Sequence, residues 1–329
     1  MKWFALAIVV SVACRGTSEE PRRAPKATGS APLPRPDHPV TTDPWLVTSS
    51  SDVPSLPERH ALADKVCPKV TAPYFYAVEK AGKVSHLLGT RHIGVALAKM
   101  PANVLEALHA AKLVVFEISP DDTRRPPRHP DVAVADELGP DLWNHYSELV
   151  GSDMAREQAT GRPASALLMM MVMYEDPSSM LEQDIENEIR DAHTPVGGLE
   201  THVFQDAVLE KLLDMRALRG AVAQTKDRKK LEHESARDLG EYCAGTDDSP
   251  GTDADARADM LAAGYTNAEV DAIDEQLVFS RNRDWIPKLE KMFETDHTVI
   301  VVGADHLIGK RGVVALLQAR GYSVARVAP

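Results

Sequence analysis

The stretch "VVGADHLIGK", residues 301 to 310, begins as a buried strand and ends in polar chemistry. An apolar run from Val299 to Val302 stops at Gly303, and two ionisable side chains, Asp305 and His306, follow at once. Ligands of open α/β sheets bind beyond the carboxyl ends of strands. The stretch therefore predicts a core strand whose end carries a functional loop.

A second stretch, "HLLGTRHIGV", repeats the design, with Gly89 placed three residues before His92. With 19 Gly and 12 His in 329 residues, chance alone gives about 0.7 such pairs, so position matters more than number. In both stretches glycine lets the chain turn sharply after a strand and a histidine follows. Each histidine alone is more typical of a hydrogen-bonded loop residue, but the pair, with Glu117 at a third strand end, favours a site.

Hydrophobic periodicity predicts the elements around these stretches. Near the N-terminus it predicts a hairpin over 74–90 that turns at Ala81 and Gly82, a helix over 101–112 and a short buried strand in "KLVVFEIS". Near the C-terminus it predicts a strand in "HTVIVVGADH", a helix in "GVVALLQARG" and a final strand in "YSVARV". The fold class is therefore α/β, with a central sheet built from N- and C-terminal βα units.

The middle of the chain predicts a helical insertion. The run "RPASALLMMMVMYEDP" is typical of a buried helix, and its methionines are typical of core packing. An acidic helix, a turn at Pro195 and a short strand then lead to Glu200. Residues 201–240 are expected to form amphipathic helix, and residues 256–293 are expected to be helical again.

The N-terminus predicts export. Residues 1–14, "MKWFALAIVVSVAC", combine Lys2 with an apolar stretch too short to span a bilayer and end at Cys14, as in a bacterial lipoprotein signal. An ordinary secretory signal is the alternative, because Ser11 stands where lipoprotein signals usually have Leu. Residues 15–60 are rich in Pro, Ser, Thr and charge and are expected to be a disordered tether. Residues 61–329 are expected to be the catalytic domain.

Composition limits the partners and the redox chemistry. The formal charge of −12 argues against nucleic acid, whose phosphates need a basic surface. If a lipid occupies Cys14, an even pair remains, Cys67 and Cys243. In an exported protein these two form a candidate disulfide. Two unpaired buried thiols are an equal alternative.

Five motifs in sequence order resemble the TraB/GumN/TIKI family, extracytoplasmic or membrane-associated proteins that include metal-dependent proteases. They cover roughly residues 70 to 329 and read "HLLGTRH", "VVFEI", "PVGGLET", "RNRDW" and "VVGADHLIGKRGVVALLQARGYSV". In this family the two motif histidines and a glutamate are the proposed metal site. The resemblance implies that His92, His306 and Glu117 bind one divalent metal ion, with Mn²⁺, Co²⁺ and Zn²⁺ not distinguished.

The chemistry of these residue types fits such a site. Two neutral imidazoles and a carboxylate leave positions open on a divalent ion, and a water bound there becomes acidic enough to attack near neutral pH. Glu200 is the candidate general base, with a fourth-ligand role as the alternative. Asp305 is expected to orient His306 or another ligand from behind.

Arg281 and Asn282 complete the candidate site. They are expected to hold a substrate carbonyl or its oxyanion, and a helix-capping or salt-bridge pair is an equal alternative. His86, Arg91 and Asp305 depart from the residue types common in the family, which leaves the substrate and the metal open.

The expected function is a metal-dependent hydrolase that acts on peptides or proteins outside the cytoplasm while a lipid on Cys14 holds it to a membrane. Two alternatives remain. One is a non-catalytic lipoprotein that binds a metal or a partner on the same fold, and the other is a hydrolase of esters.

Overall fold

The computed structural model describes residues 53–329 except 125–130, 247–250 and 253. The predicted signal, Cys14 and nearly all of the predicted tether lie outside these residues. Among the helices that are described, none has the length and apolar character needed to cross a bilayer.

The described residues form one six-stranded sheet with the order β4-β3-β5-β2-β1-β6. Its central strands read "LVVFEI" and "TVIVVG", and β5 is buried along its whole length because helices cover both faces. The α/β class predicted from the sequence is confirmed. The strands are β1 Tyr74–Lys80, β2 Lys83–Thr90, β3 Leu113–Ile118, β4 Val196–Glu200, β5 Thr298–Gly303 and β6 Ser323–Arg326.

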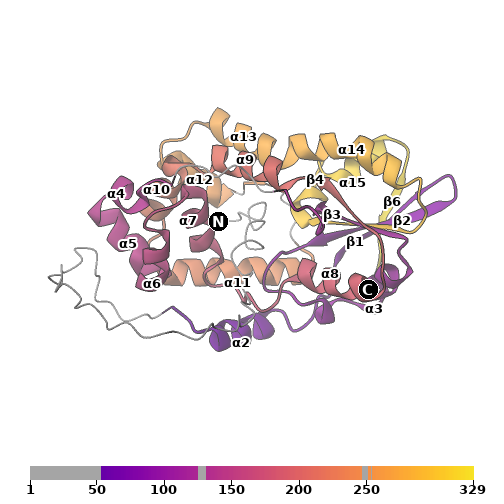
Figure 1. Ribbon diagram of the computed structural model, residues 1–329, viewed down its shortest axis with the longest axis horizontal. Helices are drawn as coiled ribbons and strands as arrows, with labels where there is room; N and C mark the ends of the chain where they lie inside the picture. The colour runs from indigo at the N-terminus through magenta and orange to yellow at the C-terminus, as the bar shows by residue number, and fades with distance from the viewer. Residues whose placement is uncertain (1–52, 125–130, 247–250, 253) are drawn as a thin grey trace, which may run out of the picture.

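Strand direction brings the predicted site together. Strands β2, β5, β3 and β4 are parallel neighbours. Strand β1 pairs antiparallel with β2, and β6 pairs antiparallel with β1 at the edge of the sheet. Register places Gly303 beside Thr90, and Glu200 beside Ile118. The carboxyl ends of the four parallel strands therefore meet at one edge, which points toward the helical half of the molecule (Figure 1).

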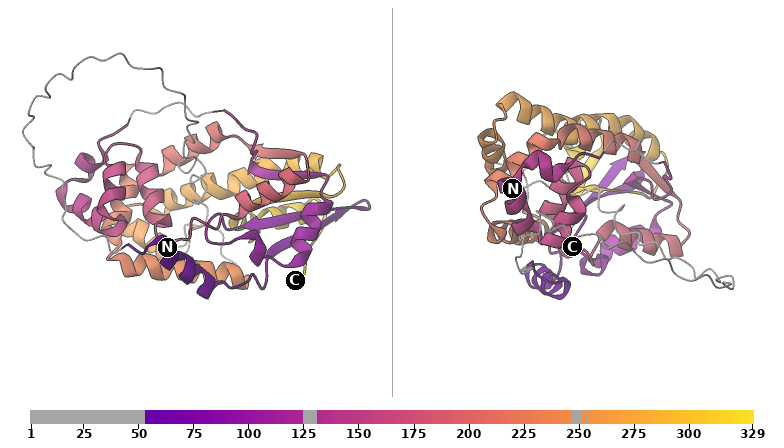
Figure 2. Two further views of the ribbon diagram at one scale, coloured as in Figure 1. Left: turned by 60° about the horizontal axis from the view of Figure 1, so that its bottom comes forward. Right: turned by 60° about the vertical axis from the view of Figure 1, so that its left-hand side comes forward.

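Helices α14 and α15 lie on one face of the sheet, and α3 and α8 lie on the other (Figures 1 and 2). Their apolar residues join those of the strands in one buried cluster, with Ile185 of α8 and Ile286 of α14 among its members. The bounds are α3 Ala102–Ala110, α8 Leu181–Asp191, α14 Ser280–Met292 and α15 Val313–Ala319, and the short 3-10 helices are η2 Leu97–Lys99 and η4 Ala304–His306.

A second hydrophobic cluster fills the helical half, as the predicted insertion requires. Trp143 and Tyr146 of α5 stack inside it, with ring centroids 5.5 Å apart. The bounds of the helices that contribute to it are α4 Val134–Leu138, α5 Pro140–Val150, α6 Ser152–Gln158, α7 Pro163–Val172, α9 His202–Leu212, α10 Met215–Gln224, α12 Ala254–Ala262 and α13 Asn267–Asp274.

Two helical segments connect the clusters. Helix α11, Arg228–Ala244, places Leu231 in the helical cluster and Tyr242 in the sheet cluster. A π-helical turn, η3 Glu275–Phe279, leads directly into α14, so Leu277 and Trp285 lie in different clusters on one continuous helical segment.

The helix expected over residues 201–240 is three helices, α9, α10 and most of α11. Asp214 and Asp227 cause the breaks, because each carboxylate accepts the backbone N–H of a residue in the next first turn, Ala217 and Lys230 respectively. Residues 201–240 are thus helical as expected, and these two caps divide them into three helices.

The folded part of the chain begins before the predicted end of the tether at residue 60. Helix α2, Leu56–Val66, begins inside it, because Ser55 and Glu58 form a reciprocal capping box and a proline occupies the first turn. Residues 56–60 therefore belong to the folded domain.

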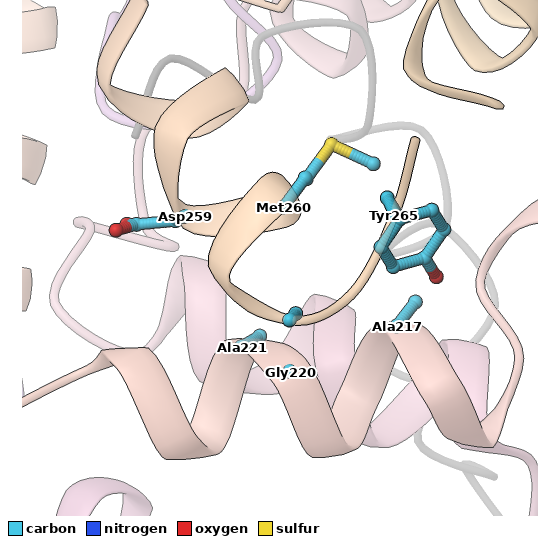
Figure 3. Close-up of a pocket in the computed structure, with 7 residues that line it drawn as sticks. Ala217, Gly220, Ala221, Asp259, Met260 and Tyr265 are labelled. Carbon is cyan, nitrogen blue, oxygen red and sulfur yellow. The ribbon is translucent and has the colours of Figure 1, made fainter. Parts of the chain in front are cut away.

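A crevice between α10 and α12 belongs to the helical packing (Figure 3). Ala217, Ala221 and Met260 line it and are members of the helical cluster. The helices touch there, because a methyl group on Gly220 would lie 2.5 Å from the Cβ of Ala263. The crevice is a close helix crossing, remote in the fold from the strand ends.

Candidate functional site

Four predicted residues lie at the carboxyl edge of the sheet. His92 follows β2, Glu117 is the penultimate residue of β3, Glu200 ends β4 and His306 follows β5. The side chains of Glu117, Glu200 and His306 are 7%, 4% and 1% exposed, whereas that of His92 is 15% exposed. Solvent therefore reaches this cluster beside His92.

Glu117 is anchored through both of its oxygens. Oε1 accepts the backbone N–H of Gly303 at 2.8 Å, and Oε2 accepts Nη2 of Arg281 at 2.7 Å. Burial opposes ionisation of Glu117, but the Arg281 guanidinium and the backbone N–H of Gly303 outweigh it and lower the pKa of Glu117 below its ordinary value. Glu117 is an anionic oxygen donor at neutral pH.

His306 presents one ring nitrogen toward Glu117. Its Nδ1 lies 2.6 Å from Oδ1 of Asn282, whose amide nitrogen donates to the backbone oxygen of Arg311 at 3.0 Å. Because that donation assigns the amide, Nδ1 of His306 carries the proton. Burial lowers the pKa of His306 to about 3, so the ring is neutral. Its buried Nε2 has no hydrogen-bond partner and lies 3.6 Å from Oε1 of Glu117.

His92 is held from the other face of the sheet. Its Nδ1 lies 2.5 Å from Oε1 of Glu182, in the first turn of α8. Burial would lower the pKa of His92, but the charge and hydrogen bond of Glu182 raise it to about 9. The same carboxylate also accepts the hydroxyl of Thr90, the last residue of β2.

The side chains of Glu117, His92 and His306 surround the open position beside Gly303. A methyl group there would lie 3.3 Å from Oε1 of Glu117, 3.6 Å from Nε2 of His92 and 3.7 Å from Cδ2 of His306. The donor types and the orphaned Nε2 of His306 fit a divalent ion. They do not form a closed ligand cluster, since within the described ranges no three His, Cys, Asp or Glu groups stand at metal-binding spacing.

Arg281 lies between the two glutamates. Its guanidinium donates to Glu117 and, through Nε at 3.0 Å and through Nη2, to Glu200. Gln205 at 3.2 Å and the Trp285 indole N–H at 3.3 Å also donate to Glu200. Burial raises the pKa of Glu200 even though Arg281 opposes this shift. The observed contacts of Arg281 are salt bridges to Glu117 and Glu200, as in the alternative to its substrate-binding role.

Asn282 makes the contact with His306 that was expected of Asp305. Asn282, fully buried in α14, contacts His306 directly, whereas the sequence had assigned it to a substrate carbonyl. Asp305 was expected to orient His306, but the hydrogen bond to Nδ1 comes from Asn282. Asp305 is 3% exposed in η4.

Sequence reasoning missed Glu182 and Thr90. Thr90 stands directly between the motif residues Gly89 and Arg91, but its hydroxyl carries no motif signal of its own. Glu182 is one acid among several in α8. It shares the first turn with Asp184, and what separates it is its place next to Leu181, whose buried side chain sets which face of the helix meets the sheet.

The candidate cysteine pair lies away from the strand ends. Cys67 at the end of α2 and Cys243 in α11 are joined by a disulfide, with Cα atoms 5.9 Å apart. Next to Cys243, the hydroxyl of Tyr242 donates to the backbone oxygen of Gly89 at 2.9 Å. The disulfide is therefore next to a residue that contacts the backbone of the first histidine motif.

No curated protein and no solved structure matches the chain at a significant level. The sequence profile of the TraB/PrgY/gumN family matches residues 74–326, which include all four strand-end residues. By this match, which spans most of its length, the chain belongs to the TraB/PrgY/gumN family.

Proposed function

We propose that this protein is a metal-dependent hydrolase that cleaves peptide bonds outside the cytoplasm. One observation carries the proposal: two imidazoles and two carboxylates from four parallel strand ends converge at one edge of the sheet. The buried Nε2 of His306, which has no hydrogen-bond partner, supports it further. Buried polar atoms are normally satisfied, so an orphaned imidazole nitrogen points to a ligand.

His92, Glu117 and His306 would hold one divalent ion, and their nitrogen and oxygen donors suit Zn²⁺, Co²⁺ or Mn²⁺. Such an ion, when bound, supplies an acidic water and polarises a carbonyl. The protein fixes the donors beforehand: Asn282 holds His306, Glu182 holds His92, and the Gly303 N–H holds Glu117.

Glu200 and Arg281 supply the remaining chemistry. Burial raises the pKa of Glu200 above its ordinary value. In the proposed reaction this carboxylate would accept the proton that the attacking water loses. Arg281, whose guanidinium holds Glu117 and Glu200, would help to stabilise the negative charge that develops on the carbonyl oxygen. The substrate enters beside His92 and Glu182, whose side chains are 15% and 26% exposed.

Metal content tests the ligand set. The purified full-length protein, loaded separately with Zn²⁺, Co²⁺ and Mn²⁺, is expected to retain about one ion per chain. His92→Ala and His306→Ala are expected to lose the ion while circular dichroism shows intact folding. His109→Ala is the matched control, because His109 is an exposed histidine that also pairs with a glutamate. Folded variants that bind metal as tightly as wild type would refute the assignment.

Glu200→Gln separates the base from a fourth ligand. If Glu200 is the base, the Glu200→Gln variant keeps the metal content of the wild type, and its cleavage rate falls by about 10² to 10⁴. If Glu200 is a ligand, the variant loses much of its metal. A peptide cleavage screen of the wild type, with and without chelator, measures the rate. Cleavage of esters alone supports the second chemistry, and a metal-loaded wild type that cleaves neither supports the binding protein.

We also propose that a lipid on Cys14 anchors the protein to a membrane outside the cytoplasm, with a peptide or protein as its partner and no nucleic acid. The apolar segment that ends in "VAC" and the polar segment after it support this. Cys14→Ser is expected to move the protein from the membrane to the soluble fraction. A wild-type protein that is already soluble and begins at another residue would contradict the anchor.

A further inference from the structure

Glu182 contacts the candidate site from outside the sheet. Its Oε1 lies 2.5 Å from Nδ1 of His92 and accepts the hydroxyl of Thr90. That hydroxyl also lies 3.2 Å from the backbone oxygen of Val302, on the neighbouring strand β5. Glu182 is therefore fixed relative to the ends of two strands that carry the histidine motifs.

This contact sets which nitrogen of His92 faces the site. The two ring nitrogens of an imidazole point in different directions, so a ring held at Nδ1 presents Nε2 elsewhere. In His92, Nε2 faces the open position beside Gly303, which the side chains of Glu117 and His306 also surround. His306 shows the same arrangement with Asn282 at Nδ1. Each ring is thus held by one helix, α8 or α14, from opposite faces of the sheet.

We infer that Glu182 is the positioning residue of the first histidine motif: it keeps the proton of the neutral His92 ring on Nδ1 and aims Nε2 at the space shared with Glu117 and His306. This inference rests on the proposed metal site. A carboxylate behind a ligating imidazole fixes its tautomer and raises its basicity, and loss of such a partner typically weakens metal binding 10- to 100-fold.

A purely structural ion pair between α8 and β2 is the competing explanation. Helix α8 does not depend on this contact, because Leu181, Ile185 and Ile189 bury its apolar face in the sheet cluster. The helix also carries a matched control. Glu188 pairs with His109 at 2.6 Å, and both of these side chains are exposed.

The experiment compares Glu182→Gln, Glu182→Ser and Glu182→Leu with Glu188→Gln and Glu188→Leu in the full-length protein. The first readout is the set of ring nitrogen chemical shifts of His92, measured by NMR in the metal-free protein at a series of pH values. Because Glu182 raises the pKa of His92 to about 9, the tautomer is read from the spectra recorded above that pH, where the neutral ring of the wild type is expected to carry its proton on Nδ1. Glu182→Gln keeps an oxygen acceptor and is expected to preserve that tautomer, whereas Ser and Leu release it.

The second readout is Zn²⁺ affinity by competition with a chromogenic chelator. Glu182→Ser and Glu182→Leu are expected to bind Zn²⁺ about 10- to 100-fold more weakly. Glu182→Gln loses less, and both Glu188 variants match wild type. If Leu disturbs folding, the Ser variant, which adds no apolar bulk, gives the answer.

The outcomes separate this inference from the proposed function. If Ser at position 182 leaves both the tautomer and the affinity at wild-type values, Glu182 is only a structural partner. If the wild type binds no Zn²⁺, Co²⁺ or Mn²⁺, the proposed metal site fails, while the nitrogen shifts of the metal-free protein still decide whether Glu182 positions His92.

Discussion

Arg281 holds together the buried charges of the strand-end cluster. Its side chain is 3% exposed and contacts Glu117 and Glu200, which are almost as buried. Two carboxylates in a site of low dielectric repel each other and lose hydration, and the guanidinium between them offsets both effects. The cation is therefore part of the architecture of the site as well as of the proposed chemistry.

Arg281→Met is expected to lower the free energy of unfolding by about 3 to 5 kcal/mol, because it leaves two buried carboxylates without their cation. Urea unfolding in the presence of a chelator measures this without interference from bound metal. Arg283→Met is the control, since Arg283 is half-exposed and pairs with Glu275 at the surface. Adding Glu117→Gln and Glu200→Gln to Arg281→Met is expected to recover part of the loss. An Arg281→Met protein as stable as the control would show that these carboxylates are not desolvated.

Among the elements, the strands and the residues at their ends were predictable, and the partners of those residues were not. Runs such as "VVFEI" and "VIVVG" identify buried strands by composition. Parallel strands share an edge, so Glu117, Glu200 and the two histidines were expected to meet. Glu182 escaped because helical periodicity shows which face of α8 is buried but not which acid lies opposite a histidine 90 residues away in sequence.

Helix boundaries failed for a related reason. The hydrophobic period of residues 201–240 continues across short breaks. Periodicity therefore predicted helix throughout and did not show the breaks at Asp214 and Asp227. Asn282 lies on a helix that sequence did predict, yet its contact with His306 depends on how α14 crosses the sheet. Local rules describe the elements, whereas packing decides which side chains meet.

Over the whole molecule, the two hydrophobic clusters are coupled by helical segments that belong to both. Helix α11 passes from Leu231 in one cluster to Tyr242 in the other, and η3 with α14 makes the same connection elsewhere. The disulfide between Cys67 and Cys243 fastens α2 to the sheet end of α11. It closes a loop with a sequence separation of 176 residues, which contains most of the helical half.

Removal of the disulfide is therefore expected to destabilise both clusters together. The chain-entropy treatment gives an upper value of about 5 kcal/mol for a loop of this length, and measured effects are often smaller. The test is urea unfolding of Cys67→Ala/Cys243→Ala against the oxidised wild type, after mass mapping of the native protein under non-reducing conditions.

Two tryptophans report the clusters separately, because Trp143 lies in the helical one and Trp285 in the sheet. With Trp3 and Trp45 replaced by Phe and either Trp143→Phe or Trp285→Phe added, fluorescence from the one tryptophan that remains follows each cluster in turn. Both midpoints are expected to fall by the same amount when the cysteines are replaced, since α11 transmits the loss. A shift confined to Trp285 would show that the helical half unfolds independently. Two freely alkylated thiols in the native protein would show that the disulfide does not form.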